Sequence, residues 1–381
     1  MTARSHWFAL MSAASMTVVA TAQETPATAT TVPPTALRVA PTTEGVSTGP
    51  VAENVDMTPN SPTLLTFEAG VTFLRRSRPH RSGVIGEVLN LDTDVVLRDV
   101  STRSIDFEFE AGPNVMLRLH EQGGRGTWDL RWLGLDSWSD RVTLETEEFD
   151  PIGTRTPVSP FAFVLEEGAE LGGIRARAHS YFHSVQFGRT GVVCDSDERT
   201  VTHYLGFRYF YFRDALEVER AGTVDNEAYG WGGNNNLIGG EIGVDLAKHY
   251  GFMTFGAKAR AGGYFNYANL KGQYNLSVGS QPNVAPVSFQ TESDDFTGIS
   301  GVLDLGVYST IHANQNFSLK FGYDLMVLTN LVAGSENMQP TLLTITPVPG
   351  TFPLVTRGSL EAHGNSTVLL HGLSVTGEVV W

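Results

Sequence analysis

The chain has little cysteine, little positive charge and no long hydrophobic run beyond its N-terminus. A single cysteine, Cys194, excludes a disulfide-stapled module. Acidic residues outnumber basic residues by 41 to 26, whereas nucleic-acid binding needs basic patches, so we expect no nucleic-acid partner. After residue 22 no stretch of about 18 apolar residues occurs, which excludes a helical membrane protein.

The sequence is instead rich in glycine and aromatic residues. It has 40 glycines among 381 residues, 10% aromatic residues and 41% hydrophobic residues. This composition suits either a soluble all-β protein or a transmembrane β-barrel.

The N-terminal region predicts export. Residues 1–22 are expected to be a secretory signal peptide, with Arg4 in a weak basic region and Ala20-Thr21-Ala22 as the cleavage site. Residues 23–63 are rich in Thr, Pro and Ala, so we expect a disordered periplasmic segment. A single β domain is then expected over residues 64–381.

From residue 64 onward, apolar and polar residues alternate, which indicates β-strands with one apolar face. Residues 105–119 show the pattern best, with Ile105, Phe107 and Phe109 on one parity and Asp106 and Glu108 on the other. This run exceeds the usual strand length of about five or six residues, and a membrane-crossing strand needs about 9–11 residues.

The same alternation recurs along the chain. Clear runs lie at 65–73, 128–132, 201–212, 238–246, 253–265, 299–311, 317–327 and 369–381, and weaker ones lie near 83–90, 141–147 and 174–187. They predict an all-β fold, a transmembrane antiparallel up-and-down β-barrel of about 12 strands. Because bacterial single-chain barrels have even strand numbers, 10 and 14 strands are the alternatives.

The expected connections differ in length at the two ends of the barrel. Short turns are predicted at Asn314–Asn316 and His249–Gly251. Long joins are predicted at 148–172, 213–235, 268–296 and 329–365. Short turns at one end and long loops at the other are typical of outer-membrane barrels.

The last residue, Trp381, closes an alternating strand. We interpret it as an insertion signal for the barrel-insertion machinery, with an ordinary terminal strand as the alternative. Outer-membrane lipid is the second expected partner, because aromatic residues cluster near the strand ends, where amphipathic rings favour the membrane interface.

Several short motifs carry a family resemblance. They are GPNVMLRL at 112–119, LRWLGLDSW at 130–138, LGFRYF at 205–210 and NNNLIGGEIGVD at 234–245, with further stretches at 258–266, 319–328 and 371–381. These motifs resemble a large outer-membrane β-barrel family known mainly from planctomycete-type bacteria. The resemblance implies a barrel in the outer membrane of a diderm bacterium and no established substrate. The sequence departs from the family pattern at 140–172 and 329–365.

No motif predicts catalysis, a cofactor or a metal site. His179 and His183 are four residues apart but lack the glutamate of a zinc-protease motif. Ser300 and Ser309 have no convincing histidine and aspartate partners. The acidic runs at 145–150 and 195–198 lack the residue order of a calcium loop. We therefore expect no catalytic, cofactor-binding or metal-binding residues.

The polar parity of the strands predicts a charged lumen. These side chains either pair across the interior or line a water-filled pore that admits small polar solutes. The alternatives are that they form a solvated sheet face or that they close the lumen completely. The candidates are Glu108, Arg118, Arg208, Glu241, Asp245, Lys258, Arg260, Asp304, Lys320, Asp324 and Glu378.

The predicted function is that of an integral outer-membrane barrel, either a narrow passive channel or a structural scaffold, without catalytic activity. Two alternatives remain at this point. One is an exported soluble β-sandwich that binds a ligand, and the other is an outer-membrane hydrolase of lipid or peptide.

Overall fold

The structure, a computed structural model, describes residues 64–80, 83–90, 95–121, 126–145, 155–158, 171–222, 225–278, 287–338, 343–346, 354–357 and 360–381. The predicted signal peptide and disordered segment lie outside these residues. All strands fall within one compact unit, Pro50–Val380; of the second unit, only Trp381 is described, and it directly follows the last strand. Within the described ranges, no helix is long and apolar enough to cross a membrane.

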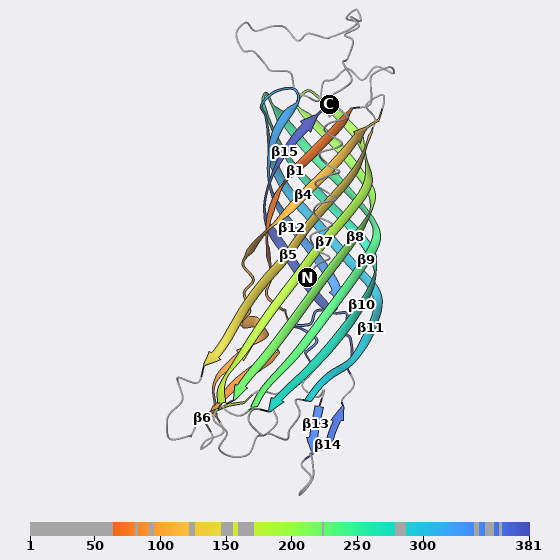
Figure 1. Cartoon of the computed structure of the whole chain (residues 1–381). Helices are drawn as coiled ribbons and strands as arrows, with labels where there is room; N and C mark the ends of the chain where they lie inside the picture. The colour runs from red at the N-terminus through yellow and green to blue at the C-terminus, as the bar shows by residue number, and fades with distance from the viewer. Residues whose placement is uncertain are drawn as a thin grey trace, which may run out of the picture. The chain divides into compact units, whose positions relative to one another are not determined.

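Ten of the described strands close an antiparallel barrel in which β1 pairs with β15 (Figure 1). The predicted barrel is confirmed, and ten strands is the lower end of the expected range. The barrel strands are β1 (Leu65–Arg76), β4 (Phe109–His120), β5 (Gly126–Glu145), β7 (Leu171–Ser196), β8 (Arg199–Gly222), β9 (Asp225–Tyr250), β10 (Met253–Val278), β11 (Val287–His312), β12 (Phe317–Leu331) and β15 (Ser366–Val380).

The other described strands lie outside the barrel wall. β2 (Val84–Asn90), β3 (Val95–Ser101) and β6 (Arg155–Val158) form a three-stranded sheet, and β13 (Leu343–Thr346) pairs with β14 (Leu354–Arg357). The weak pattern near 83–90 therefore belongs to β2, and that near 141–147 overlaps the end of β5. These assignments account for the difference between about twelve expected strands and ten observed ones.

Alternation along the strands places apolar residues outside the barrel and polar residues inside it. In β11, Ile299 and Val307 face outward and are 75% and 59% exposed, whereas Ser300 and Asp304 face inward and are buried. An exposed apolar exterior around a closed ring of strands suits a lipid environment. The alternative of a soluble β-sandwich is therefore wrong.

Strands β7 to β11 are 24–26 residues long, whereas about 9–11 residues suffice to cross a bilayer. Their polarity inverts along their length. In β7, Val185 and Phe187 face outward and are exposed, but nearer the N-terminal end of the strand the outward residues are Arg175 and Arg177, and Phe182 is buried inside. We infer that the inversion marks the membrane boundary, beyond which the strands extend into water.

The inversion corrects two predicted long joins, 213–235 and 268–296. In both regions the strands continue, apart from the undescribed residues 223–224 and 279–286. In β8 the apolar residues move from the outward parity of Leu205 and Phe207 to the inward parity of Phe212 and Leu216. Because the alternation changes phase, the sequence pattern ends at a position where the strand itself continues.

The predicted short turns are confirmed. β9 and β10 are joined at residues 251–252, where Gly251 has a φ of 58°, a conformation that favours glycine. β11 and β12 are joined by residues 313–316. Short turns face the periplasm in outer-membrane barrels. The end of the barrel that carries these turns, where β1 begins and β15 ends, therefore faces the periplasm.

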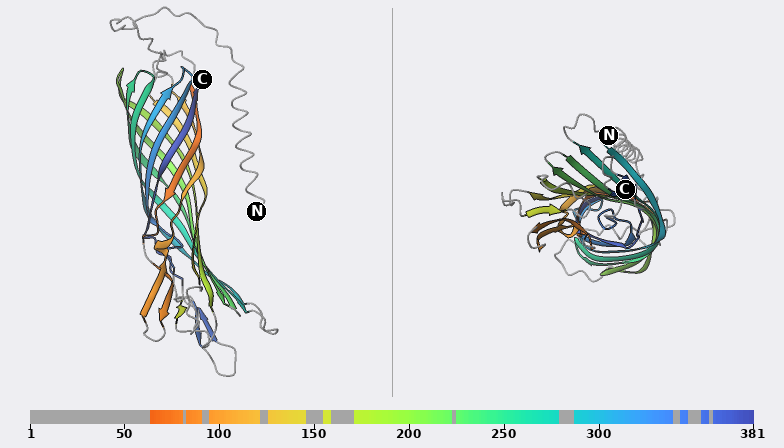
Figure 2. Two further views of the ribbon diagram at one scale, coloured as in Figure 1. Left: turned by 90° about the vertical axis from the view of Figure 1, so that its left-hand side faces the viewer. Right: turned by 90° about the horizontal axis from the view of Figure 1, so that it is seen from below.

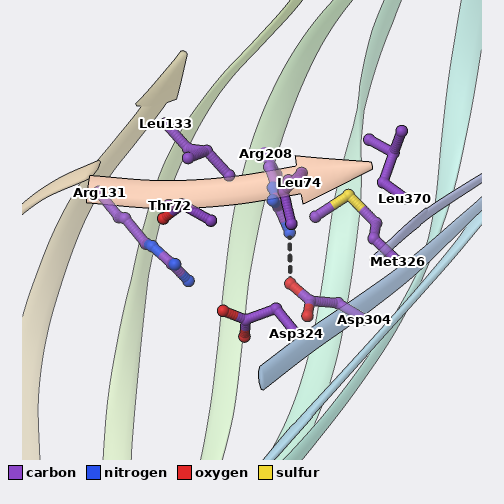
Figure 3. A pocket seen from close by; sticks show the side chains of 9 residues that line it. All are labelled: Thr72, Leu74, Arg131, Leu133, Arg208, Asp304, Asp324, Met326 and Leu370. Carbon is purple, nitrogen blue, oxygen red and sulfur yellow. Dashed lines mark hydrogen bonds and ion pairs between the residues drawn. The ribbon is translucent and has the colours of Figure 1, made fainter. Parts of the chain in front are cut away.

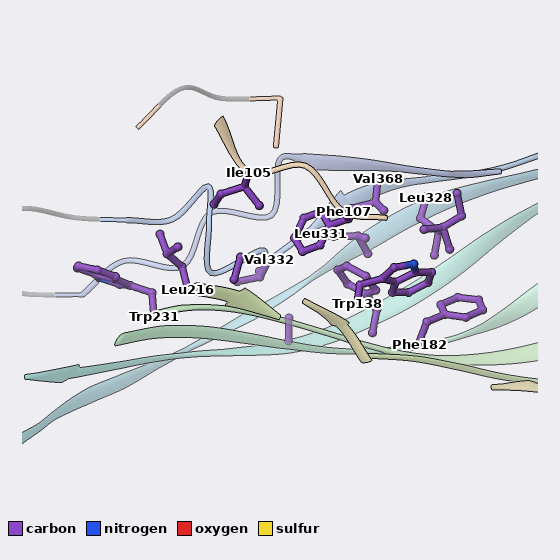
Figure 4. Packing of buried hydrophobic residues seen from close by; sticks show 14 of the residues in the cluster. Ile105, Phe107, Trp138, Phe182, Leu216, Trp231, Leu328, Leu331, Val332 and Val368 are labelled. Atoms are coloured by element: carbon purple, nitrogen blue, oxygen red, sulfur yellow. The ribbon is translucent and has the colours of Figure 1, made fainter. Parts of the chain in front are cut away.

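One strand prediction is partly wrong. The run at 105–119 was expected to be one strand, but β4 begins at Phe109. Ile105 and Phe107 are fully buried in the apolar core instead (Figure 4). A tertiary contact that no local pattern encodes holds this segment, because the Asp106 backbone N–H donates to Asp140 over 2.6 Å.

The chain after β12 turns into the barrel. We call residues Leu331–Asn337 the inner segment; Leu331, Val332 and Ala333 have no exposed surface. The Val332 N–H donates to Asn235 Oδ1 and the Asn235 side-chain amide donates to the Val332 carbonyl, both over 2.8 Å. Seen along the barrel, blue chain from the C-terminal third lies within the ring of strands (Figure 2).

Candidate functional site: the lumen

The described lumen has three zones, which we name the vestibule, the ion-pair layer and the apolar zone. The vestibule is a cavity of about 320 Å³ at the periplasmic end. Its lining contains Thr66, Arg118, His120, Asp129, Thr190, Thr200, Thr202, Tyr204, Asp245, Thr254, Arg260, Tyr308, Thr310, His312, Lys320 and Glu378. It is therefore a polar chamber rich in threonine, with charges of both signs.

On one wall of the vestibule, carboxylates surround Arg118. Its Nε donates to Asp129 Oδ1 over 2.9 Å, and its Nη2 lies 3.2 Å from Glu68 Oε1. Glu68 also lies directly opposite Glu378 in the register of β1 and β15, where the barrel closes. The two glutamates face each other beside a shared cation, which lowers the cost of their like charges.

Two further cations of the vestibule lie over aromatic rings. The Arg260 guanidinium is 4.1 Å from the ring centre of Tyr204, and Lys320 Nζ is 4.3 Å from that of Tyr308. The Tyr308 hydroxyl in turn donates to Asp245 over 2.7 Å. Cation–π contacts of this kind hold a charge in place without a carboxylate.

The ion-pair layer lies next to the vestibule, further from the periplasmic end of the barrel, and centres on the buried Arg208. Arg208 Nη1 donates to Asp304 over 3.1 Å (Figure 3). The same Nη1 lies 3.7 Å from Glu241, and the Arg208 Nε donates to Ser184 over 2.7 Å. Glu241 also accepts hydrogen bonds from Gln186 and, over 2.9 Å, from the Tyr264 hydroxyl. A buried charge is tolerated only when it is paired in this way.

A second ion pair completes the layer. Lys258 Nζ lies 2.6 Å from Asp324, which also accepts a hydrogen bond from Ser374 over 3.0 Å. The space left here is about 10 Å³, room for about one water molecule. It is lined by Thr72, Leu74, Arg131, Leu133, Arg208, Asp304, Asp324, Met326 and Leu370 (Figure 3).

The apolar zone fills the lumen beyond the ion-pair layer. Wall residues such as Trp138, Phe182 and Leu328 pack there with Val332 of the inner segment (Figure 4). A small polar cluster is embedded in it: Asp214 accepts hydrogen bonds from Arg76, Ser180 and Ser335. No exposed surface remains on Asp214.

Ten of the predicted lumen charges lie in the lumen, in the vestibule or the ion-pair layer. Arg118, Asp245, Arg260, Lys320 and Glu378 line the vestibule, whereas Arg208, Glu241, Lys258, Asp304 and Asp324 form the ion-pair layer. Glu108 differs: it precedes β4, is exposed and is not among them. A role of these charges in selectivity stays a prediction.

Four charged residues that the structure places in the lumen were not among the predicted ones. Glu68 and Asp129 lie on the polar parity of short alternating runs, so the same rule could have selected them. Arg76 and Asp214 carried no such signal. They are inward-facing charges among apolar neighbours, and only the fold brings them together.

The two histidines four residues apart lie on the outer surface of β7. His183 Nε2 is 3.1 Å from Asp136, and His179 packs edge-on against Tyr181. Within the described ranges, no group of three or more His, Cys, Asp or Glu side chains is placed to hold a metal ion.

A closed antiparallel barrel with an apolar exterior and a charged interior defines an integral outer-membrane β-barrel protein. The chain belongs to the family described as "Putative beta barrel porin-7 (BBP7)", whose model matches residues 160–381, more than half of the sequence. The family resemblance and the outer-membrane localisation are thereby confirmed.

Three solved structures match the chain at low similarity. The outer membrane protease OmpT from Escherichia coli is 8% identical, with a TM-score of 0.44 over 85% of this chain and 99% of that chain. The toluene transporter TodX of P. putida is 7% identical, with a TM-score of 0.22 over 84% and 91%. A FadL homologue from Pseudomonas aeruginosa is 8% identical, with a TM-score of 0.21 over 82% and 90%. No curated protein matches the chain.

Proposed function

We propose that this protein is a closed structural barrel of the outer membrane, without catalytic activity and without a standing pore. The observation that carries the proposal is the filling of the lumen. Beyond the vestibule, the ion-pair layer leaves a cavity of only about 10 Å³, and the apolar zone is packed with fully buried side chains. An aqueous path needs continuous polar space, which these two zones do not provide.

A narrow passive channel is the second candidate. The name of the family favours it, and so does the vestibule of about 320 Å³, which holds space for small polar solutes. Conduction would require the inner segment to leave the barrel. The two hydrogen bonds between Val332 and Asn235, and those from Ser335 to Asp214, oppose that movement.

The absence of catalysis rests on the placement of the polar side chains. Ser180 hydrogen-bonds to Asp214 and Arg76, Ser335 hydrogen-bonds to Asp214, and no histidine of the described residues joins this cluster. A serine nucleophile needs a neighbouring general base. Arginine does not serve as one, because it stays protonated.

Permeation into liposomes tests the proposal. Full-length protein is inserted into liposomes, and its correct folding is checked by heat-modifiable gel migration. We expect small neutral sugars to enter no faster than into protein-free liposomes. Rapid, protein-dependent entry would support the channel instead.

A further inference from the structure

Three outward-facing arginines form a strip on one side of the barrel, beyond the apolar exterior. They are Arg141 in β5, Arg177 in β7 and Arg213 in β8, and the first two are exposed. Arg141 lies directly opposite Arg177 in the register of β5 and β7, and Arg213 lies opposite Tyr181 in that of β7 and β8. We call these three residues the arginine strip.

The three arginines of the strip form no ion pair with a described carboxylate. Like charges directly opposite each other destabilise a pair of strands, so Arg141 and Arg177 favour an anion between them. Among the described side chains, no carboxylate forms an ion pair with them, although Glu217 lies opposite Arg177; nearby Arg175, by contrast, reaches Glu219 over 3.8 Å.

Arg213 also has unused hydrogen-bonding capacity. Its guanidinium lies 5.9 Å from the ring centre of Tyr181, and its buried Nε has no hydrogen-bond partner within the described part of the chain. Planar guanidinium groups with free N–H donors match the geometry of phosphate oxygens.

The position of the strip relative to the membrane points to the ligand. The exposed apolar exterior ends on β8 at Tyr209 and on β7 at Val185. Arg213 lies four residues beyond Tyr209, or about 13 Å along the strand, and Arg177 lies about twice that distance beyond Val185. The polar layer of a phospholipid leaflet is only about 5–8 Å thick. Only an extended headgroup reaches both arginines.

The other side of the barrel is different. At a similar level on β10 and β11, the outward residues are Asn269, Lys271, Ser293 and Asp295, and Asn269 donates to Asp295 over 2.6 Å. Lys271 is the one cation among these four residues and has no cation opposite it, whereas the clustered arginines lie on β5, β7 and β8. A strip on one side indicates a localised ligand rather than a general attraction to an anionic surface.

We propose that Arg141, Arg177 and Arg213 bind the phosphate groups of a glycolipid with an extended, phosphorylated saccharide headgroup in the outer leaflet. The acyl chains lie against the apolar exterior of β7 and β8, and the phosphates reach the guanidinium groups above it. The site is independent of whether the lumen is open or closed.

Lipid retention measured by native mass spectrometry tests the site. The full-length protein in neutral detergent is mixed with lipopolysaccharide, with enzymatically dephosphorylated lipopolysaccharide or with phosphatidylglycerol. We expect wild type to retain lipopolysaccharide most strongly. The R141Q/R177Q/R213Q variant is expected to bind it at least about tenfold more weakly, since each arginine near an anionic headgroup contributes several-fold.

The control variant is Lys271→Gln, which removes one outward cation from β10 and should leave retention unchanged. Heat-modifiable migration reports the folding of every variant, and a triple variant that fails to fold is replaced by the single variant Arg177→Gln. The proposal is overturned if the variants retain lipopolysaccharide as wild type does, or if Lys271→Gln loses it equally. Equal retention of the dephosphorylated form, or of phosphatidylglycerol, also contradicts the site.

Discussion

At the scale of single residues, the most demanding feature is the pairing of Arg76 with Asp214. Both side chains are almost completely buried among apolar residues, and Asp214 also accepts hydrogen bonds from Ser180, over 2.9 Å, and from the Ser335 N–H, over 3.0 Å. Ser335 belongs to the inner segment. The pair therefore connects β1 and β8 of the wall to the chain inside the lumen.

Removal of the carboxylate should be costly. Asp214→Ala leaves Arg76 buried without a counter-charge, so we expect the free energy of unfolding to fall by about 3–5 kcal/mol. Urea titration of vesicle-inserted protein measures the change. The matched control is Glu217→Ala on the same strand, where the exposed side chain should contribute no more than about 0.5 kcal/mol. Equal stability of Asp214→Ala and wild type would show that the pair is not essential.

A second residue-scale prediction concerns pH. Hydrogen bonds from Arg78 and Arg75 lower the pKa of Asp106 to about 2. A lowered pKa in the folded state stabilises the fold above the ordinary aspartate pKa of about 3.9, and this stabilisation is lost as the pH falls towards about 2.

The pH effect is tested with Asp106→Asn. Because the ion pairs of Asp106 are partly exposed, the free energy of unfolding of wild type should exceed that of the variant by no more than about 1 kcal/mol at neutral pH. The difference should shrink as urea titrations are repeated from about pH 5 towards pH 2. A difference that stays constant over this range would show that the ionised carboxylate is not its source.

At the scale of strands, the main finding is the polarity inversion in β7 to β11. Alternation predicted where strands cross the membrane, because there the apolar parity faces lipid. It did not predict the parts of the strands that extend beyond the membrane. There the outer face meets water and the inner face meets the apolar core, so the apolar residues lie on the opposite parity. Strand β8 contains both phases, with Phe207 facing outward and Phe212 facing inward, and a window that assumes the first phase interprets the second as a loop.

The inversion predicts where an outward charge is tolerated. On the outward face of β11, Leu303 lies within the exposed apolar exterior and Ser293 lies beyond it. We expect Leu303→Arg to lower the free energy of unfolding in vesicles by about 2–4 kcal/mol and Ser293→Arg to change it by less than about 1 kcal/mol. Similar costs at the two positions, measured by urea titration, would place the membrane boundary elsewhere.

At the scale of the whole molecule, the barrel could be predicted from the sequence, but the filling of its lumen could not. Ten of the predicted lumen charges, Arg208 and Lys258 among them, lie inside because parity fixes the direction of a strand side chain. The burial of Ile105, Phe107 and the inner segment depends on contacts between parts of the chain far apart in sequence. Such contacts leave no local periodicity.

Single-channel recording in planar bilayers tests the closed lumen most directly. Full-length protein whose insertion is verified by heat-modifiable migration should give no stepwise conductance in salt solution. The ion-pair layer and the apolar zone leave no continuous aqueous path, so the baseline should match that of the protein-free bilayer. Stable, protein-dependent conductance steps of uniform size would contradict the closed barrel and establish a channel.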